Sequence, residues 1–182
     1  MSIVPLSPWL AHRPRRGAIT TDTVVLHASD QTDVDELVRA LRTEEHSYHY
    51  IVDPDGVILK CVPFSAVAFH CQNSYGPHEA LRHVSSERDG HGGFMEHTCV
   101  NEYTIGVCLI HDGGGTAAYP KAQTDACAAL LKDLKTPLPK LRYVTTHAAV
   151  SPNRATDPEG FDVAAFAVAA ELEAWFPEAA YA

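Results

Sequence analysis

The stretch Thr23–Leu41 reads TVVLHASDQTDVDELVRAL, and the prediction of the fold starts from it. Its first four residues are β-prone and lead directly to His27, which predicts a short strand with a histidine at its carboxyl end. The polar residues 28–33 follow as a loop. Apolar residues then recur at helical spacing from residue 34 to residue 41, which predicts a helix. The stretch is therefore predicted to form a strand, a loop and a helix.

The residues that follow predict a hairpin and a buried strand. Residues 48–52 and 57–62 are β-prone and flank Asp53-Pro54-Asp55-Gly56, a composition typical of a turn. Residues 104–110 are apolar on both faces, which is typical of a buried strand. Residues 74–100 are polar and weakly periodic, and loops of that length are usually functional or mobile.

The last third of the chain completes the pattern. Residues 121–134 have helical spacing, residues 142–146 are β-prone and end next to His147, and residues 161–176 have the composition of a closing helix. Strands that pair with one another and alternate with helices predict an α/β fold. We expect a mixed central β-sheet flanked by about three helices in a single domain.

Length and charge limit the classes of function. With 182 residues and 46% hydrophobic content, the chain can build one ordinary core, and we divide it into an N-terminal arm at residues 1–20 and one domain at residues 21–182. The basic cluster 13–16 is interpreted as a solvated part of that arm. A net charge of -9 argues against nucleic acid and anionic membranes as partners.

Two further features indicate the compartment. The chain starts without the apolar run of a signal peptide and contains no apolar stretch of membrane-span length. Its five cysteines are odd in number and lack CxxC spacing, so neither a disulfide framework nor a cysteine zinc site is predicted. We therefore expect synthesis in a reducing cytoplasm.

Two histidines and one aspartate predict a metal site. His27 and His147 each follow a β-prone run, and Asp157 lies in a proline-containing loop shortly after His147. Two imidazoles and a carboxylate can supply the three protein ligands of a catalytic zinc, which suits amide hydrolysis at neutral pH. A purely structural role is the alternative, because eleven histidines make chance pairs easy.

Several ordered segments resemble the type-2 N-acetylmuramoyl-L-alanine amidases, a family that includes phage lysozymes of amidase type, anhydro-muropeptide amidases and peptidoglycan recognition proteins. The resemblance covers about residues 21–166, and the segments that carry it are Val25-Leu26-His27-Ala28-Ser29, Tyr48-His49-Tyr50-Ile51-Val52 with Asp55-Gly56, Val62-Pro63-Phe64 with Phe69-His70, Asn101 through Ile105-Gly106-Val107, and His147 through Asp157-Pro158.

The resemblance implies a role for each candidate residue. It makes His27, His147 and Asp157 the ligands of a Zn2+ ion at the sheet edge, and it places His70 beside the substrate. The alternative for His70 is a half-buried core histidine. Tyr48 matches a tyrosine of the phage branch that orients the water or supports the developing oxyanion.

The sequence also departs from the family at two positions. Cys108 stands where the anhydro-muropeptide amidases have a glutamate, so a general base from that strand is absent. Ala155 stands where many members have a lysine two residues before the third ligand. The neighbouring Arg154 is the candidate replacement for that cation. A second metal site among the histidines of residues 74–100 is an open but less favoured alternative.

The predicted function is zinc-dependent hydrolysis of the amide bond between N-acetylmuramic acid and L-alanine in peptidoglycan or muropeptides, by a monomer. Two alternatives stay open: a peptidoglycan-binding module with little catalysis, and a zinc amidase that acts on another acyl-amide. A soluble anhydro-muropeptide substrate implies work in the cytoplasm, whereas a phage or prophage lysin would be released to the cell wall.

Overall fold

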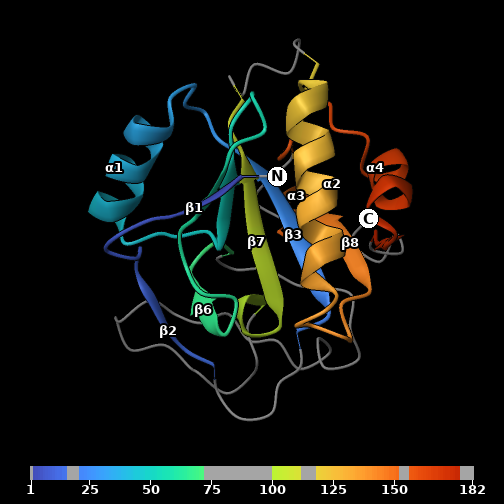
Figure 1. Cartoon of the computed structure of the whole chain (residues 1–182), viewed down its shortest axis with the longest axis horizontal. Coiled ribbons are helices and arrows are strands. Elements are labelled where there is room, and N and C mark those ends of the chain that lie inside the picture. The colour runs from blue at the N-terminus through green and yellow to red at the C-terminus, as the bar shows by residue number, and fades with distance from the viewer. Residues whose placement is uncertain (1, 16–20, 72–99, 112–117, 152–155, 177–182) are drawn as a thin grey trace.

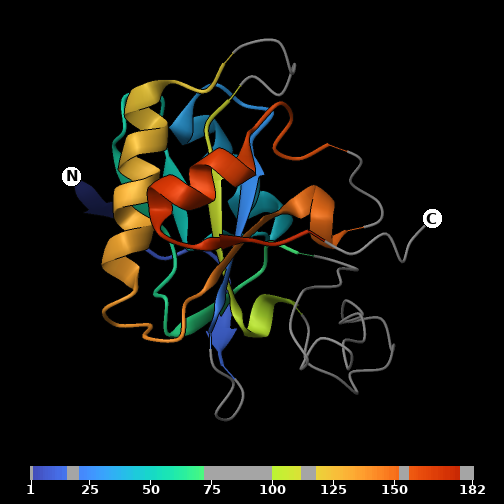
Figure 2. The ribbon, with the colours of Figure 1, turned by 90° about the vertical axis from the view of Figure 1, so that its right-hand side faces the viewer.

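The protein folds as three layers with a β-sheet in the middle (Figures 1 and 2). The computed structural model describes residues 2–15, 21–71, 100–111, 118–151 and 156–176. Helix α1 (Val34–Glu44) covers one face of the sheet, and helices α2 (Lys121–Leu134) and α4 (Val163–Ala170) cover the other. The predicted α/β fold with a mixed central sheet is confirmed.

Seven strands of the described residues form the main sheet. In spatial order they are β1 (Ile3–Pro5), β5 (Ile58–Lys60), β4 (Tyr50–Val52), β7 (Thr104–Leu109), β3 (Thr23–Ala28), β8 (Tyr143–Thr146) and β9 (Glu173–Ala174). The neighbouring strands β4, β7, β3, β8 and β9 run parallel to one another. Strand β5 is antiparallel to β4. Strands β2 (His12–Pro14) and β6 (Ala66–Ala68) pair as a separate antiparallel ribbon. The central position of β3 and β7 places His27 and Cys108 side by side in register.

The helices differ from the prediction near the end of the chain. Four α-helices are described where about three were expected, because the short helix α3 (His147–Val150) follows β8 directly. The closing helix ends at Ala170, where Glu171 adopts the left-handed conformation with φ 57°, and the chain then forms β9. A short 3-10 helix, η2 (Val100–Glu102), precedes β7.

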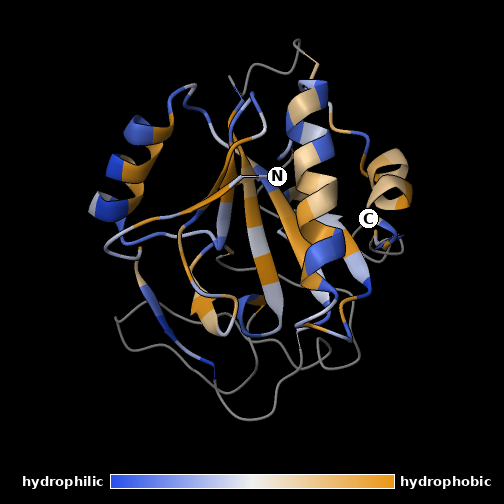
Figure 3. Cartoon of the chain, viewed as in Figure 1, coloured by the Kyte–Doolittle hydropathy of each residue, from blue (hydrophilic) through white to orange (hydrophobic). Residues whose placement is uncertain are grey.

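The largest apolar cluster lies between the sheet and α2 and α4. Alternate residues of the central strands point to this side, among them Val24, Leu26, Val107 and Leu109, and pack against Leu130, Leu131 and Phe166. Figure 3 shows the apolar colouring of the central strands behind α2 and the mixed apolar and polar colouring of the side of α2 that faces away from the sheet. Because side chains alternate across a strand, His27 and Cys108 must face the opposite side, toward α1.

Helix α1 is built as its sequence predicts. The Asp33 side chain accepts a hydrogen bond from the Glu36 N–H at 2.8 Å, which satisfies one of the donors at the start of the helix. Leu37 and Leu41 lie on the buried stripe and pack in the cluster that contains Cys108. The helix therefore forms a wall beside the carboxyl end of the central strands.

The N-terminal residues are fastened to this core. Residues 3–5 pair with β5 in the main sheet, and residues 12–14 pair with β6. Arg13 forms an ion pair with the buried Glu102, and Arg15 donates hydrogen bonds to backbone carbonyls of residues 64, 101, 102 and 104. The interpretation of the basic cluster as solvated is therefore wrong for Arg13 and Arg15.

None of the helices described here is long and apolar enough to cross a bilayer.

Candidate metal centre

His27 lies near the carboxyl end of β3, in the middle of the sheet. Its side chain is fully buried, and its ring centroid is 4.5 Å from that of His147 and 5.1 Å from that of His70. The two ring nitrogens face different neighbours: Nδ1 lies 3.7 Å from Oδ2 of Asp157, and Nε2 lies 3.0 Å from Nδ1 of His70. His27 thus lies between Asp157 on one side and His70 on the other.

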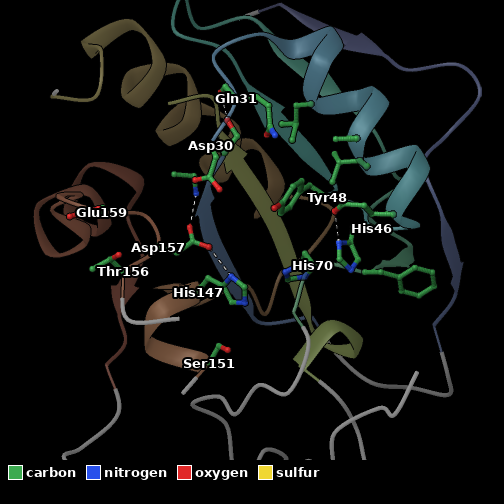
Figure 4. Close-up of a pocket in the computed structure, with 17 residues that line it drawn as sticks. Asp30, Gln31, His46, Tyr48, His70, His147, Ser151, Thr156, Asp157 and Glu159 are labelled. Carbon is green, nitrogen blue, oxygen red and sulfur yellow. Dashed lines mark hydrogen bonds and ion pairs between the residues drawn. The ribbon is translucent and has the colours of Figure 1, made fainter. Parts of the chain in front are cut away.

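His147 and Asp157 meet His27 from the next strand. His147 is the first residue of α3, directly after β8, and its Nδ1 lies 2.8 Å from Oδ2 of Asp157 (Figure 4). The other carboxylate oxygen accepts a hydrogen bond from the Ala28 N–H at 2.7 Å, and the Asp157 carbonyl accepts one from the Ala148 N–H. The carboxylate is therefore anchored to the strand that carries His27 and to the helix that carries His147.

The environment keeps Asp157 ionised. Burial alone would raise the pKa of its carboxyl group, but the hydrogen bond from His147, the nearby His27 ring and the Ala28 N–H together lower that pKa well below its usual range. An ionised carboxylate and two imidazoles at this depth form a donor set with one negative charge.

This donor set fits zinc. Ligand atoms about 2.1 Å from a tetrahedral zinc lie roughly 3.4 Å from one another. The distances from Oδ2 of Asp157 to His147 Nδ1, 2.8 Å, and to His27 Nδ1, 3.7 Å, bracket that value. Ligand atoms of all three residues lie within 4.8 Å of one another. The three residues predicted as ligands are thus brought together as a group that could hold a zinc ion.

A pocket of about 490 Å³ opens onto this cluster (Figure 4). His147 and Asp157 line it together with Tyr48, whose ring centroid lies 4.9 Å from that of His27. Helix α1 contributes one wall, including Glu44. A substrate that enters the pocket would reach the candidate ligands and the Tyr48 side chain from the same side.

His70 lies at the inner wall of the pocket and is only 7% exposed. Nδ1 faces His27 Nε2 at 3.0 Å and the Cys71 thiol at 3.1 Å, while Nε2 lies 3.1 Å from the Thr104 hydroxyl. Burial lowers the pKa of His70 well below its usual value, and the neighbouring histidines and Arg15 lower it further. The structure thus surrounds both ring nitrogens of His70 with protein groups.

Cys108 is fully buried next to this cluster. Burial is the largest cause of a strongly raised pKa of its thiol, and the charge of Asp157 raises it further, although a hydrogen bond with Tyr48 opposes both. The thiol is therefore protonated at neutral pH, which agrees with the expectation that this strand supplies no general base.

Two of the candidate regions lie outside the described residues. These are Arg154 with its neighbour Ala155, and residues 72–99, which hold His78, His83, His91 and His97. The predictions made for them stay predictions.

Three contacts of the site were not predicted from sequence. Cys71 and Thr104 touch His70, and Gly106 lies against its ring, where a Cβ atom would come within 2.5 Å of His70 Cγ. A glycine inside an otherwise apolar strand signals a close approach of another group, and that signal was present at Gly106. Nothing in the local sequence marks Cys71 or Thr104.

Comparisons with known proteins identify the family. The family described as N-acetylmuramoyl-L-alanine amidase matches residues 16–160. The 1,6-anhydro-N-acetylmuramyl-L-alanine amidase AmpD of Escherichia coli is 31% identical over 129 residues, which are 70% of this chain and 60% of that protein. The protein of the same name from Citrobacter freundii is 30% identical over 122 residues, 66% of this chain and 54% of its own length. Both matches span less than two thirds of the relative.

Solved structures share the fold. A selenomethionine derivative of AmpD superposes with a TM-score of 0.63 at 24% identity, covering 92% of this chain and 93% of its own. The endolysin N-acetylmuramoyl-L-alanine amidase LysCS from Clostridium intestinale gives 0.67 at 16% identity, with coverage of 94% and 97%. Drosophila PGRP-LB gives 0.57 at 17% identity, with coverage of 91% and 92%. At these identities the comparison shows a common fold.

Proposed function

The chain belongs to the N-acetylmuramoyl-L-alanine amidase family, and from that premise we propose that it is a zinc-dependent hydrolase of the amide bond between N-acetylmuramic acid and L-alanine. The observation that carries the proposal is the convergence of His27, His147 and Asp157 at the pocket, with Asp157 held ionised by its hydrogen bonds. A binding module without catalysis would have no need for a buried, oriented carboxylate between two imidazoles.

The proposed division of labour follows from the positions of the side chains. A zinc ion bound by His27, His147 and Asp157 would lower the pKa of a water molecule toward neutrality and polarise the scissile carbonyl. The Ala28 N–H holds the Asp157 carboxylate in one orientation. Tyr48 lines the pocket and is placed to donate a hydrogen bond to the carbonyl oxygen as negative charge develops on it.

We keep Arg154 as the proposed source of a cation near the oxyanion. The support is its position in the sequence, next to Ala155 and within the loop that carries Asp157. His70 was expected beside the substrate, and it lines the pocket. Because protein groups face both of its ring nitrogens, we propose that His70 acts on His27 and not on the substrate.

The proposal is tested by measuring metal and turnover in the same samples. The full chain, purified without chelator, should hold one zinc per molecule and release peptide from muropeptides. His147→Ala and Asp157→Asn should lose zinc and activity together, whereas His12→Ala, which changes an exposed histidine of β2, should lose neither. The metal site would be refuted if the protein holds well below one zinc per molecule and this content does not rise when zinc is added.

The substrate form needs a separate comparison. The curated relatives are named as 1,6-anhydro-N-acetylmuramyl-L-alanine amidases, so soluble anhydro-muropeptides are the first substrates to test. Intact wall sacculi are the second, because a structural neighbour is an endolysin. Binding of either substrate by the zinc-loaded chain without product would favour the binding-module alternative. Hydrolysis of a different acyl-amide, with no turnover of either wall substrate, would favour the alternative of a zinc amidase that acts on another acyl-amide.

A further inference from the structure

A line of hydrogen-bonding groups runs from η2 through the sheet to the candidate metal centre. The Thr104 hydroxyl lies 2.7 Å from the Val100 carbonyl oxygen and 3.1 Å from Nε2 of His70. Nδ1 of His70 lies 3.0 Å from Nε2 of His27, whose Nδ1 faces Asp157. Thr104 and His27 are fully buried, and His70 is nearly so. Solvent therefore has little access to this line of groups.

The hydroxyl proton of Thr104 determines which group donates and which accepts in each of these hydrogen bonds. A carbonyl oxygen has no proton to give, so the 2.7 Å contact with Val100 requires that Thr104 donates its one hydroxyl proton there. The hydroxyl oxygen can then only accept from its other neighbour. The contact at 3.1 Å is therefore a hydrogen bond donated by the Nε2–H of His70.

The same reasoning assigns the proton positions on the rings of His70 and His27. A neutral imidazole carries one proton, so a His70 protonated on Nε2 presents Nδ1 as an acceptor. Nε2 of His27, at 3.0 Å, must then be the donor, and the Cys71 thiol at 3.1 Å is a second donor to the same atom. A neutral His27 protonated on Nε2 directs the lone pair of Nδ1 toward Asp157 and His147.

We propose that Thr104 and His70 are positioning residues that hold the proton of His27 on Nε2 and so present Nδ1 as the metal-binding atom. The proposal deepens the proposed function, because it rests on His27 as a zinc ligand. Histidine ligands commonly donate their second ring N–H to a neighbouring acceptor, which fixes the tautomer and the ring orientation. Here the acceptor is a second histidine, whose own tautomer is fixed by a threonine hydroxyl.

Packing keeps His70 in place for this task. Gly106 of β7 leaves the space that the ring occupies, since a Cβ atom there would lie 2.5 to 2.8 Å from three ring atoms. The Gly106 N–H donates to Nδ1 of His49, a second buried ring whose centroid lies 6.0 Å from that of His70. The His70 ring is thus confined by the strand, by Thr104 and by His27.

The first test reads the tautomers directly. Long-range proton–nitrogen NMR correlations of the metal-free full chain at neutral pH distinguish the protonated nitrogen of each imidazole. We expect both His70 and His27 to carry the proton on Nε2, assigned with His70→Gln and His27→Gln samples. A His70 that carries its proton on Nδ1 would overturn the proposal. This measurement does not depend on amidase activity.

The second test measures zinc affinity by chelator competition. Thr104→Val has nearly the same shape but offers His70 no acceptor, so it frees His70 to place its proton on Nδ1 and to force the His27 proton onto the metal-binding atom. We expect zinc binding to weaken about 10-fold to 100-fold, as for other groups that orient a metal ligand. Thr104→Ser keeps the hydroxyl and should bind zinc like the wild type.

The outcomes separate this proposal from the proposed function. Wild-type zinc affinity and unchanged tautomers in a folded Thr104→Val protein would refute the role of Thr104, whatever the activity. If Thr104→Val does not fold, the wild-type NMR result and Thr104→Ser decide the question. Zinc binding with the expected tautomers but no muropeptide turnover would uphold the proton arrangement and refute the proposed reaction.

Discussion

The ring of Tyr48 packs beside that of His27, with the two centroids 4.9 Å apart and the two planes tilted by 56°. Tyr48 also lines the pocket with His147 and Asp157. Tyr48 therefore lies beside the three candidate ligands without being one of them. This arrangement separates its expected effect on turnover from any effect on zinc content.

Tyr48→Phe should lower kcat about 100-fold to 1000-fold, as expected for the loss of one oxyanion donor. Zinc stoichiometry and KM should change little, because the three metal ligands are untouched. Tyr143→Phe, at the opposite end of β8 from His147, is a matched control that should keep the wild-type rate. An unchanged kcat in Tyr48→Phe would assign this side chain to packing.

Cys108→Ala should leave most of the activity in place. Burial and the charge of Asp157 raise the pKa of the thiol, so Cys108 has no proton-accepting form at neutral pH. Removing a true general base costs about 10²-fold to 10⁴-fold in rate, and we expect a far smaller change here. The cost should appear in stability instead, at about 1 kcal/mol in urea unfolding. A rate loss of general-base size would contradict this assignment.

Arg154 and Ala155 offer a reciprocal pair of substitutions. If the site needs a cation near the developing oxyanion, Arg154→Ala should lower kcat by the roughly 100-fold typical of such groups, while Ala155→Lys should raise it. Zinc content serves as the control for both variants. No change in either rate would leave the bound metal and Tyr48 as the sources of stabilisation.

His49 should make the fold sensitive to acid. Burial chiefly, and then the charge of Arg15, lower its pKa from 6.5 to about 3, although the Ala66 carbonyl opposes them. Between these two values the unfolded state binds a proton that the folded state does not, so the free energy of unfolding falls as pH decreases. Above pH 6.5 this group contributes no pH dependence.

The measurement is urea unfolding at several pH values within that window. His49 alone should contribute a loss of up to about 1.4 kcal/mol for each pH unit. His49→Gln should be less stable than the wild type at neutral pH, yet its free energy of unfolding should depend less steeply on pH. Equal slopes in wild type and His49→Gln would mean that His49 is already charged in the folded protein.

The sequence contained enough information for most of the fold. Periodicity found α2 with its observed bounds, Lys121–Leu134, because a long helix repeats its apolar stripe several times. The strands of three residues at the N-terminus, β1 and β2, carry too few residues for any period to show. Their pairing depends on β5 and β6, which lie more than forty residues later in the chain.

The candidate site also contains residues that were predictable from sequence and contacts that were not. His27 and His147 follow β-prone runs, and the sheet brings them together because their strands are parallel neighbours. His70 was predicted as a site residue from the resemblance, but its contact with Thr104 was not predictable, because the two residues meet only through tertiary packing and share no local pattern. Gly106 carried the one visible signal, a glycine in a buried strand.

The guanidinium group of Arg15 joins several parts of the fold at once. Nη1 and Nη2 donate to the carbonyl oxygens of residues 64, 101, 102 and 104, and Nη2 lies 3.3 Å from Nε2 of His49. Lysine cannot span these carbonyls with a single ammonium group. Arg15→Lys should therefore lower the free energy of unfolding by about 2–4 kcal/mol, while Arg39→Lys on the exposed face of α1 should change it little.

The same substitutions test the link to His49. Because the charge of Arg15 lowers the pKa of His49, Arg15→Ala should raise that pKa toward its unfolded value and narrow the window of acid sensitivity. Arg15→Ala should then lose stability at neutral pH but lose less of the remainder on acidification. Arg15→Lys, which keeps a positive charge, should retain more of the wild-type slope. A slope that is the same in all three proteins would show that burial alone controls the His49 proton.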